Sequence, residues 1–208
     1  TNPNKKFSSG IRMDLTKFTN KEFDENKTSN ELRVSAKYKI SNKLTLEIES
    51  ESGKKTDDIG FLQKKDGEIY FGRRDINSVE NSLDLNFNID NYKYLSLRFR
   101  NFWSTANYDN VLFSLKNDGM RELTDHSKLD FDPNTNFNLW NLDLNFDWWF
   151  SPGSTITLQY KNQIFNRDNE SGLKYYKSLK NLFEFPVEHQ LSLRINYLID
   201  FNKLRRND

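Results

Sequence analysis

The sequence predicts an all-β protein, a transmembrane antiparallel up-and-down β-barrel of about ten strands that occupies residues 1–208 as one domain. Three observations favour this fold class. Apolar and polar residues alternate over segments of roughly ten residues, which is the length that a tilted strand needs to cross a bilayer. Short turns alternate with longer connections, as on the two sides of an outer-membrane barrel. Aromatic residues gather near the predicted strand ends, where a membrane meets water.

The composition excludes several classes of protein. Lys and Arg number 31 and Asp and Glu 30, so there is no basic surface for nucleic acid. Cysteine is absent, which excludes disulfides and thiolate sites. No apolar run approaches the roughly 20 residues of a helical membrane span. The mean hydropathy of -0.87 still suits a barrel, because a barrel strand shows lipid only every second side chain. No secretory leader opens the sequence, so we expect a processed protein or the C-terminal part of a longer one.

The clearest hairpin covers residues 137–164. Even positions from 140 to 150 are apolar and odd ones are polar, the chain turns at 151–153, and the same alternation then resumes. Period two on both arms of a short turn predicts a β-hairpin. We expect Asp143 to face Lys161 across it.

The other strands are predicted from the same alternation. They cover residues 10–19, 31–41, 44–49, 59–65, 68–73, 83–89, 95–100 and 189–201. Short turns are expected at 42–43, 66–67, 90–92 and 151–153, and longer connections at 20–30, 51–57, 104–134 and 166–187. Asp66-Gly67 favours a type I′ turn. A short link near 76–80 is the exception to the alternation of connection lengths.

The polar face of the hairpin at residues 31–49 is rich in charge. A three-residue connection would set Lys39 opposite Glu47 and Lys37 opposite Glu49. Opposite charges on neighbouring strands attract each other. We therefore expect ion pairs on the face that lies away from lipid.

The aromatic residues are expected to form two girdles that flank an aliphatic band. The girdle near the short turns would contain Tyr92, Tyr94, Trp148, Trp149, Phe150, Tyr197 and Phe201. The girdle near the long connections would contain Phe102, Trp103, Phe137, Trp140 and Phe165.

The two longest connections are the predicted contact surfaces. Residues 104–134 contain Asn117-Asp118-Gly119, which is typical of a short internal hairpin, and residues 166–187 contain apolar residues at helical spacing. Aromatic residues anchor protein interfaces. The predicted contact residues are Trp103, Tyr108, Phe113, Tyr175, Tyr176 and Phe183.

Several segments resemble the C-terminal barrel region of a family of bacterial outer-membrane proteins of unknown function. They are FGRRDINSVENSLDLNFNI, YDNVLFSLKNDG, FNLWNLDLNFDWWFSPGSTITLQYKNQIF and HQLSLRINYLID, within about residues 65–201. The resemblance is most specific from Trp148 to Ser154. It implies an outer-membrane location and a longer protein with an N-terminal domain similar to family-nine carbohydrate-binding modules. No such module is visible in this sequence, and the resemblance carries no catalytic motif.

Catalytic and metal-binding candidates are few. His126 lies near Asp125 and Ser127, and His189 opens the last predicted strand. Both would lie at a rim where some outer-membrane hydrolases place a histidine with a serine or an acid, although a loop histidine is usually only solvated. The Asp and Glu residues are spread along strands, so we expect neither a metal site nor a cofactor.

We expect a non-enzymatic outer-membrane barrel that acts as a scaffold or accessory subunit of an envelope complex, in contact with membrane lipid and other envelope proteins. The inward charges mix both signs, whereas a selective pore shows a ring of one sign. They are Lys37, Lys39, Glu47, Glu49, Asp84, Arg98, Arg100, Asp143, Asp147, Lys161 and Arg194. The alternatives are a passive or glycan-selective channel and a rim-site hydrolase that uses His126 or His189.

Overall fold

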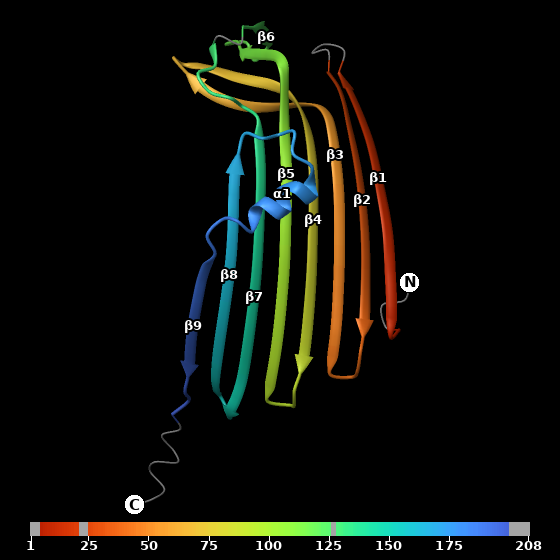
Figure 1. Cartoon of the computed structure of the whole chain (residues 1–208), viewed down its shortest axis with the longest axis vertical. Coiled ribbons are helices and arrows are strands. Elements are labelled where there is room, and N and C mark those ends of the chain that lie inside the picture. The colour runs from red at the N-terminus through yellow and green to blue at the C-terminus, as the bar shows by residue number, and fades with distance from the viewer. Residues whose placement is uncertain (1–4, 21–24, 126–127, 200–208) are drawn as a thin grey trace, which may run out of the picture.

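The computed structural model describes residues 5–20, 25–125 and 128–199, which form one antiparallel sheet with a short helix against it (Figure 1). The strands are β1 (Phe7–Asn20), β2 (Glu25–Lys39), β3 (Leu44–Lys65), β4 (Glu68–Asn88), β5 (Lys93–Leu115), β6 (Arg121–Thr124), β7 (Thr135–Ser151), β8 (Ser154–Asp168) and β9 (Glu188–Asn196), and the helix is α1 (Tyr175–Leu182). The order is β1-β2-β3-β4-β5-β7-β8-β9, and β6 pairs with the outer part of β5. Among the described residues, no helix is long and apolar enough to cross a membrane.

The prediction of an all-β antiparallel protein is confirmed, but the sheet is not closed. Its described part has nine strands instead of about ten, with β1 and β9 as the two unpaired edges. The strands are longer than expected because the predicted connections at 51–57 and 76–80 lie inside β3 and β4. Residues 51–57 are polar on both faces, and in 76–80 the two apolar residues, Ile76 and Val79, point to opposite faces, so no apolar period marks either segment. The backbone ladder between the two strands nevertheless continues, with one register shift between Lys55 and Asp58.

Other boundaries also differ from the prediction. Residues 25–30 lie in β2 and residues 104–115 lie in β5, so neither segment is a connection. Strand β9 ends at Asn196, short of the predicted end at Phe201, which lies outside the described residues together with the basic residues 203–206. The predicted internal hairpin is confirmed, because β6 returns along the outer part of β5.

The hairpin of β7 and β8 matches its prediction. Asp143 is the cross-strand partner of Lys161, and their charged groups are 3.9 Å apart. The turn at Asp66-Gly67 also has the expected conformation, with φ of 54° and 85°. However, this turn lies at the opposite end of the sheet from the turns at 40–43, 89–92 and 152–153, because β3 and β4 are single long strands.

The predicted register between β2 and β3 is wrong by two residues. Lys37 faces Glu47 and donates from Nζ to Glu47 Oε1 at 2.6 Å, while Lys39 faces Thr45. The connection occupies residues 40–43 and is therefore longer than the sequence suggested. A shift of two residues keeps every side chain on its face, so the ion pairing across the polar face survives.

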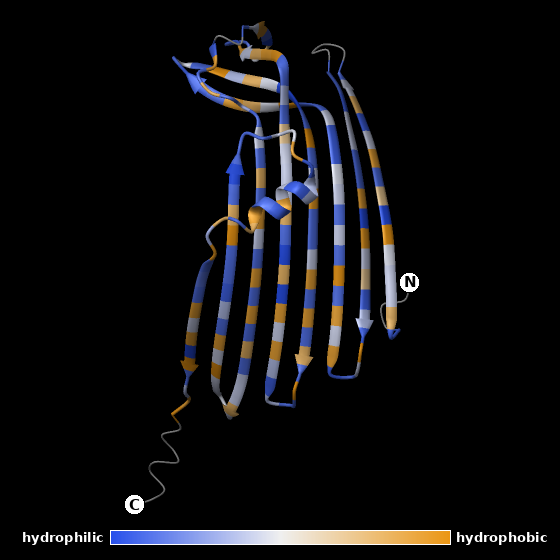
Figure 2. Cartoon of the chain, viewed as in Figure 1, coloured by the Kyte–Doolittle hydropathy of each residue, from blue (hydrophilic) through white to orange (hydrophobic). Residues whose placement is uncertain are grey.

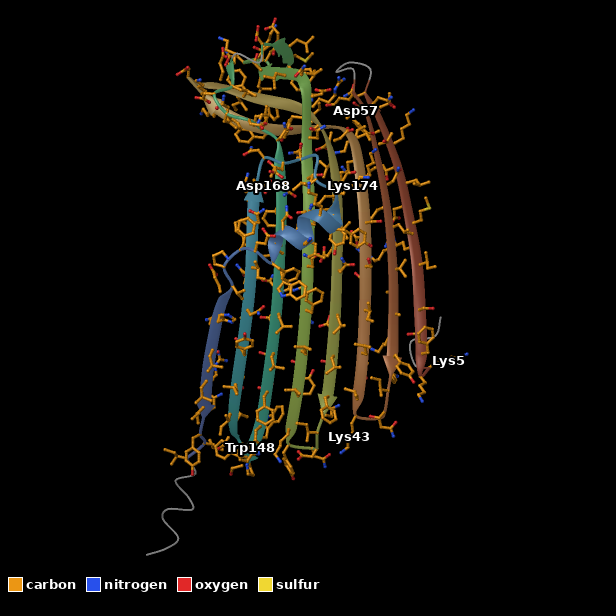
Figure 3. The ribbon with its side chains drawn as sticks, in the orientation of Figure 1. Lys5, Lys43, Asp57, Trp148, Asp168 and Lys174 are labelled. Carbon is orange, nitrogen blue, oxygen red and sulfur yellow. The ribbon has the colours of Figure 1, made fainter. Side chains whose placement is uncertain are left out.

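The register divides the sheet into two faces. The face that carries Leu144 is called the band face, and the one that carries Asp143 is called the charged face. Apolar residues of the band face gather in the part of each strand near the short turns, where they form a continuous apolar band (Figure 2). The band includes Leu46, Ile48, Leu83, Leu85, Leu97, Phe99, Leu142, Leu144, Phe146, Leu158 and Leu193. Figure 3 places Lys43 and Trp148 at the end where these turns lie.

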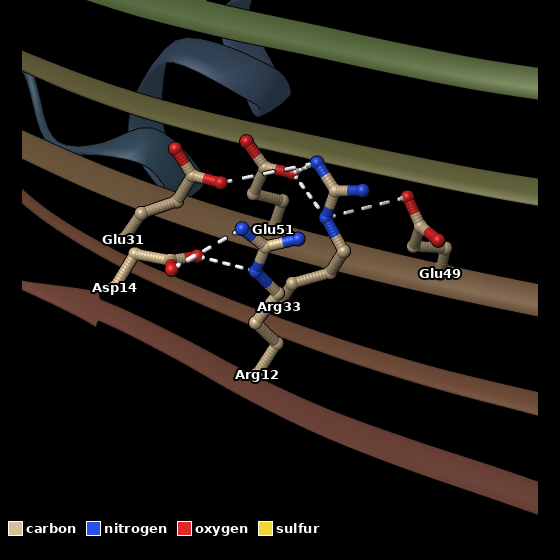
Figure 4. A network of polar contacts seen from close by, with 6 residues as sticks. All are labelled: Arg12, Asp14, Glu31, Arg33, Glu49 and Glu51. Carbon is tan, nitrogen blue, oxygen red and sulfur yellow. Dashed lines mark hydrogen bonds and ion pairs between the residues drawn. The ribbon is translucent and has the colours of Figure 1, made fainter.

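Ion pairs cross the charged face from strand to strand. Arg33 of β2 donates from Nε to Glu51 of β3 at 2.7 Å and lies 3.8 Å from Glu49, while Arg12 and Asp14 pair on β1 at 2.6 Å (Figure 4). The series continues over β4, β5, β7 and β8 with Arg98–Asp84 at 2.5 Å, Arg100–Asp143 at 3.6 Å and Lys161–Asp143. Arg12, Arg33, Arg98, Arg100 and Lys161 of this face therefore each have an acidic partner within the sheet.

The outer ends of β3 and β4 bend across the end of the sheet (Figure 1). An ion cluster fixes the base of the bend: Asp58 accepts hydrogen bonds from Lys27 Nζ and, at 3.0 Å, from Arg74 Nε. Arg74 also donates from Nη1 to the Tyr108 hydroxyl at 2.7 Å. A Cβ atom at Gly60 would overlap the Arg74 guanidinium, so a larger residue there would displace this guanidinium from its present position.

The bend is expected to loosen in acid. Burial on its own raises the pKa of Asp58, but the hydrogen bonds and charges of Lys27 and Arg74 outweigh it and hold the pKa below its usual value. Because the folded-state pKa lies below the unfolded value of about 3.9, the stabilisation is present above that pH and is lost as the pH falls through the folded-state pKa. Hydrogen exchange of the amides in residues 58–74, corrected for intrinsic rates, should show falling protection below about pH 4.

The Asp58→Asn variant provides the check on this cause. Its protection should already be reduced at neutral pH and should change little on acidification. Asp66→Asn, at the hairpin tip where asparagine tolerates the positive φ, is the matched control and should behave as the parent chain does. An unchanged acid response in Asp58→Asn would show that another group controls the bend.

Candidate functional site at helix α1

Helix α1 lies on the band face, against β5, β7 and β8 (Figure 1). Its inward positions, Ser178 and Leu182, are four residues apart and both are buried. Tyr176 points outward and is 82% exposed. Lys180 lies in the last turn, where a positive charge interacts favourably with the helix dipole. The predicted helical segment within residues 166–187 is therefore confirmed.

A buried polar network attaches the middle of α1 to β7. Asn138 donates from Nδ2 to Ser178 Oγ at 3.1 Å, and Ser178 Oγ donates to Asn136 Oδ1 at 3.1 Å. Asn136 and Asn138 have no exposed surface, and Ser178 is 2% exposed. Hydrogen bonds among fully buried groups are costly to break, because each unpaired group loses its solvation without compensation.

Tyr175 attaches the start of α1 to two further strands. Its hydroxyl donates to Asn101 Oδ1 on β5 at 2.8 Å and accepts from Asn81 Nδ2 on β4 at 2.9 Å. Burial and the neighbouring Tyr176 raise the pKa of Tyr175, against the opposing hydrogen bond from Asn81. The hydroxyl therefore stays protonated at neutral pH and remains a donor to Asn101.

Aromatic contacts complete the attachment at both ends of α1. The Trp103 indole donates from Nε1 to Asn136 Oδ1 at 3.0 Å, and its ring centroid lies 5.7 Å from that of Tyr175. At the other end, Phe183 packs edge-on against Trp140, with ring centroids 5.0 Å apart. These contacts place α1 along the border where the apolar band gives way to polar residues.

A cleft of about 720 Å³ opens on the band face beside the start of α1. Strands β1 to β5 form its floor, residues 171–175 form one wall, and Figure 3 shows Lys174 in this region. Met13, Leu32, Val79 and Trp103 provide apolar surface. The polar lining residues include amides and hydroxyls, among them Asn30, Ser52, Asn77, Thr105 and Asn107, and the charged residues Glu31, Lys54, Asp75 and Lys174.

The structure brings together only part of the predicted contact surface. Trp103, Tyr175 and Phe183 meet around α1, and Tyr176 is exposed on the outer side of the helix. Tyr108 and Phe113 lie further out on β5 and belong to a strand instead of a loop. Tyr108 contacts Arg74 at the bend, and the Phe113 ring lies 5.6 Å from the Arg121 guanidinium.

Sequence reasoning missed the asparagine residues that hold α1. Asn136 and Asn138 continue the even-numbered, otherwise apolar series of β7, so their side chains fall on the band face. An amide that interrupts an apolar series indicates that a polar partner covers that position. That signal was present in the sequence, but the partner, Ser178, follows about 40 residues later.

The predicted outer aromatic girdle is divided between the two faces. Trp103 and Trp140 lie on the band face beneath α1, whereas Phe102, Phe137 and Phe165 lie on the charged face. These three phenylalanines contact one another, with ring centroids 5.7 Å and 5.3 Å apart. At the other end, Tyr92, Trp148, Trp149 and Phe150 line one shallow pocket by the short turns, and Tyr197 stacks on Phe150. Tyr94 instead lies on the charged face, opposite Asp147, and Phe201 lies outside the described residues.

The histidine candidates differ in what the structure describes. His126 lies outside the described residues. His189 lies on β9, where its Nδ1 is 2.8 Å from the Tyr160 hydroxyl. Beside it, the buried Oδ1 of Asn162 has no hydrogen-bond partner among the described residues. Within that part of the chain, no three His, Asp or Glu side chains are grouped to hold a metal ion.

Comparison with known proteins identifies a family without an assigned activity. A family model described as a domain of unknown function, DUF5916, matches residues 1–207. Among solved structures, the P. putida toluene transporter TodX is similar with a TM-score of 0.32 and 13% sequence identity. That match covers 76% of this chain, and the chain spans 52% of the transporter. No curated protein sequence matches.

Proposed function

The chain belongs to the DUF5916 family of domains of unknown function, and from that premise we propose that it forms part of the wall of an outer-membrane β-barrel. In this proposal the band face contacts lipid and the charged face lines the interior. The domain acts as a non-enzymatic scaffold that presents α1 and the outer connections to other envelope proteins.

The apolar band is the observation that carries the proposal. Large apolar side chains of the band face are exposed on β1, β3, β8 and β9: Ile11 78%, Met13 65%, Ile48 46%, Leu158 40%, Leu191 70% and Leu193 62%. Leu83, Leu97 and Leu144 on the central strands between them are half-buried. A continuous apolar surface of this kind is unfavourable in water and marks a membrane or interaction surface. On β7 the band extends from Trp140 to Trp148, close to the roughly nine to eleven residues of a tilted membrane strand.

The charged face supports the same orientation. Its ion pairs need water or one another, and lipid provides neither. The series from Arg12 to Lys161 mixes both signs, which favours a structural interior over a charge-selective pore.

The sheet edges add a requirement to the proposal. Unpaired backbone groups are strongly disfavoured in hydrocarbon, so transmembrane sheets are closed. The outer edges of β1 and β9 must therefore be paired in the membrane, either with each other or with further strands. We expect these strands to come from the same polypeptide, since barrel strands of bacterial outer-membrane proteins belong to one chain.

Extraction of the protein from native outer membranes in mild detergent, followed by mass spectrometry of co-purifying proteins, tests the proposal. Gel mobility that changes on heating, together with envelope proteins in fixed stoichiometry, is the expected result. A lone heat-modifiable barrel that conducts ions across a planar bilayer would replace the scaffold function with a channel. A water-soluble monomer would overturn the membrane assignment itself.

A further inference from the structure

We propose that the cleft beside α1 binds the sugar head of a membrane glycolipid. The inference rests on the proposed function, because it takes the band face to be the lipid-facing side. It adds a specific ligand class and a specific site to that assignment.

The lining of the cleft suits a polyhydroxylated ligand. Asparagine side chains both donate and accept hydrogen bonds, as pairs of neighbouring sugar hydroxyls do. Asn30, Asn77 and Asn107 supply such amides, and Ser52 supplies a hydroxyl. The volume of about 720 Å³ lies within the range of small-molecule sites.

Several of these groups are available for a ligand. The side chains of Asn30, Ser52 and Lys54 form no hydrogen bond or ion pair with any described residue, although each lines the cleft. Among the described residues, the Asn77 side chain has one long hydrogen bond, 3.5 Å from its Nδ2 to Thr105 Oγ1. The wall opposite them is rigid, because Trp103 and Tyr175 are held by the buried network under α1.

The position of the cleft connects the sugar site to the lipid. Met13 and Leu32 belong to its lining, and Ile11 and Val34 follow them along β1 and β2 on the same face. All four are more than two-fifths exposed. A glycolipid with its sugars in the cleft would lay its acyl chains along this apolar path, because apolar chains and apolar side chains associate away from water.

The closing experiment uses the full chain in phospholipid nanodiscs, with native mass spectrometry as the readout. Lipopolysaccharide and its deacylated oligosaccharide are titrated separately. Both should bind, the intact glycolipid more tightly. The Asn30→Ala/Asn77→Ala variant should weaken both by about tenfold, since two hydrogen-bonding amides are lost. Asn141→Ala, an amide of the charged face, is the matched control and should bind as the parent does.

The outcomes separate this inference from the proposed function. Equal binding of lipopolysaccharide to the parent and the double variant would overturn the cleft as the site. Equal affinity for the oligosaccharide and the intact glycolipid would overturn the contribution of the apolar path. No binding by a chain that inserts and remains heat-modifiable would overturn the inference alone, whereas failure to insert would overturn the proposed function. Asn30→Ala alone, at an exposed position, keeps the test valid if the double variant folds poorly.

Discussion

Replacement of Leu144 by arginine is expected to lower the free energy of unfolding in lipid vesicles by about 2–4 kcal/mol, the cost of a cation at the lipid-facing midplane of a barrel. Leu144 lies midway between Trp140 and Trp148 on β7, with Leu97 and Tyr160 as its cross-strand partners. Urea titration followed by tryptophan fluorescence measures the effect, and the gel-mobility change on heating reports assembly.

The adjacent residue provides the control for this prediction. Asn145 points to the charged face, where its Oδ1 accepts a hydrogen bond from Gln159 Nε2 at 2.7 Å. Asn145→Arg removes that hydrogen bond, worth about 0.5–1.5 kcal/mol, but leaves the charge away from lipid and near Asp143 and Asp147. Equal losses for the two variants would contradict the lipid-facing assignment of the band. A soluble sheet would tolerate Leu144→Arg better, since the arginine would meet water.

Alternation in the sequence predicted the strands of the apolar band well, because successive side chains of a strand point to opposite faces and only one face of this sheet is apolar. The pairing of β7 with β8, including Asp143 with Lys161, follows directly from this pattern. The same reasoning failed at residues 51–57, where both faces are polar and the backbone ladders with β2 and β4 continue the strand. Such pairing cannot be predicted from a local sequence pattern, because the partner strand lies elsewhere in the sequence.

The candidate site depended even more on contacts between distant segments. Helical spacing predicted α1, and three of the aromatic contact residues meet around it. Its position over β5 and β7 was not predicted, because the anchoring amides could not be matched to Ser178 and Tyr175 from spacing alone. The register between β2 and β3 was also mispredicted. The connection at 40–43 is longer than expected, so Lys37 faces Glu47 and not Glu49.

Replacement of Asn136 by leucine is expected to release α1 from the sheet. Asn136 Oδ1 accepts hydrogen bonds from the Trp103 indole and the Ser178 hydroxyl, and its Nδ2 donates to Asp168 Oδ1 at 3.1 Å. Leucine has a similar size but leaves these buried donors without an acceptor, at about 1–3 kcal/mol for each. Trypsin cleavage at Lys177, followed over time on the folded protein, should accelerate by about tenfold or more, because cleavage follows the population of the open state.

Asn145→Leu is the control for the release of α1, since it also exchanges a hydrogen-bonded amide for leucine but lies on the charged face, away from the helix. It should leave cleavage at Lys177 unchanged. If Asn136→Leu also left cleavage unchanged, the aromatic contact of Phe183 with Trp140 would suffice to hold α1, and the buried amides would serve only the packing of β5 against β7. Faster cleavage restricted to Asn136→Leu would instead show that polar contacts hold this helix at the border of the apolar band. That is the arrangement expected where the surface changes from lipid to water, because hydrogen bonds specify position while apolar contact alone allows sliding.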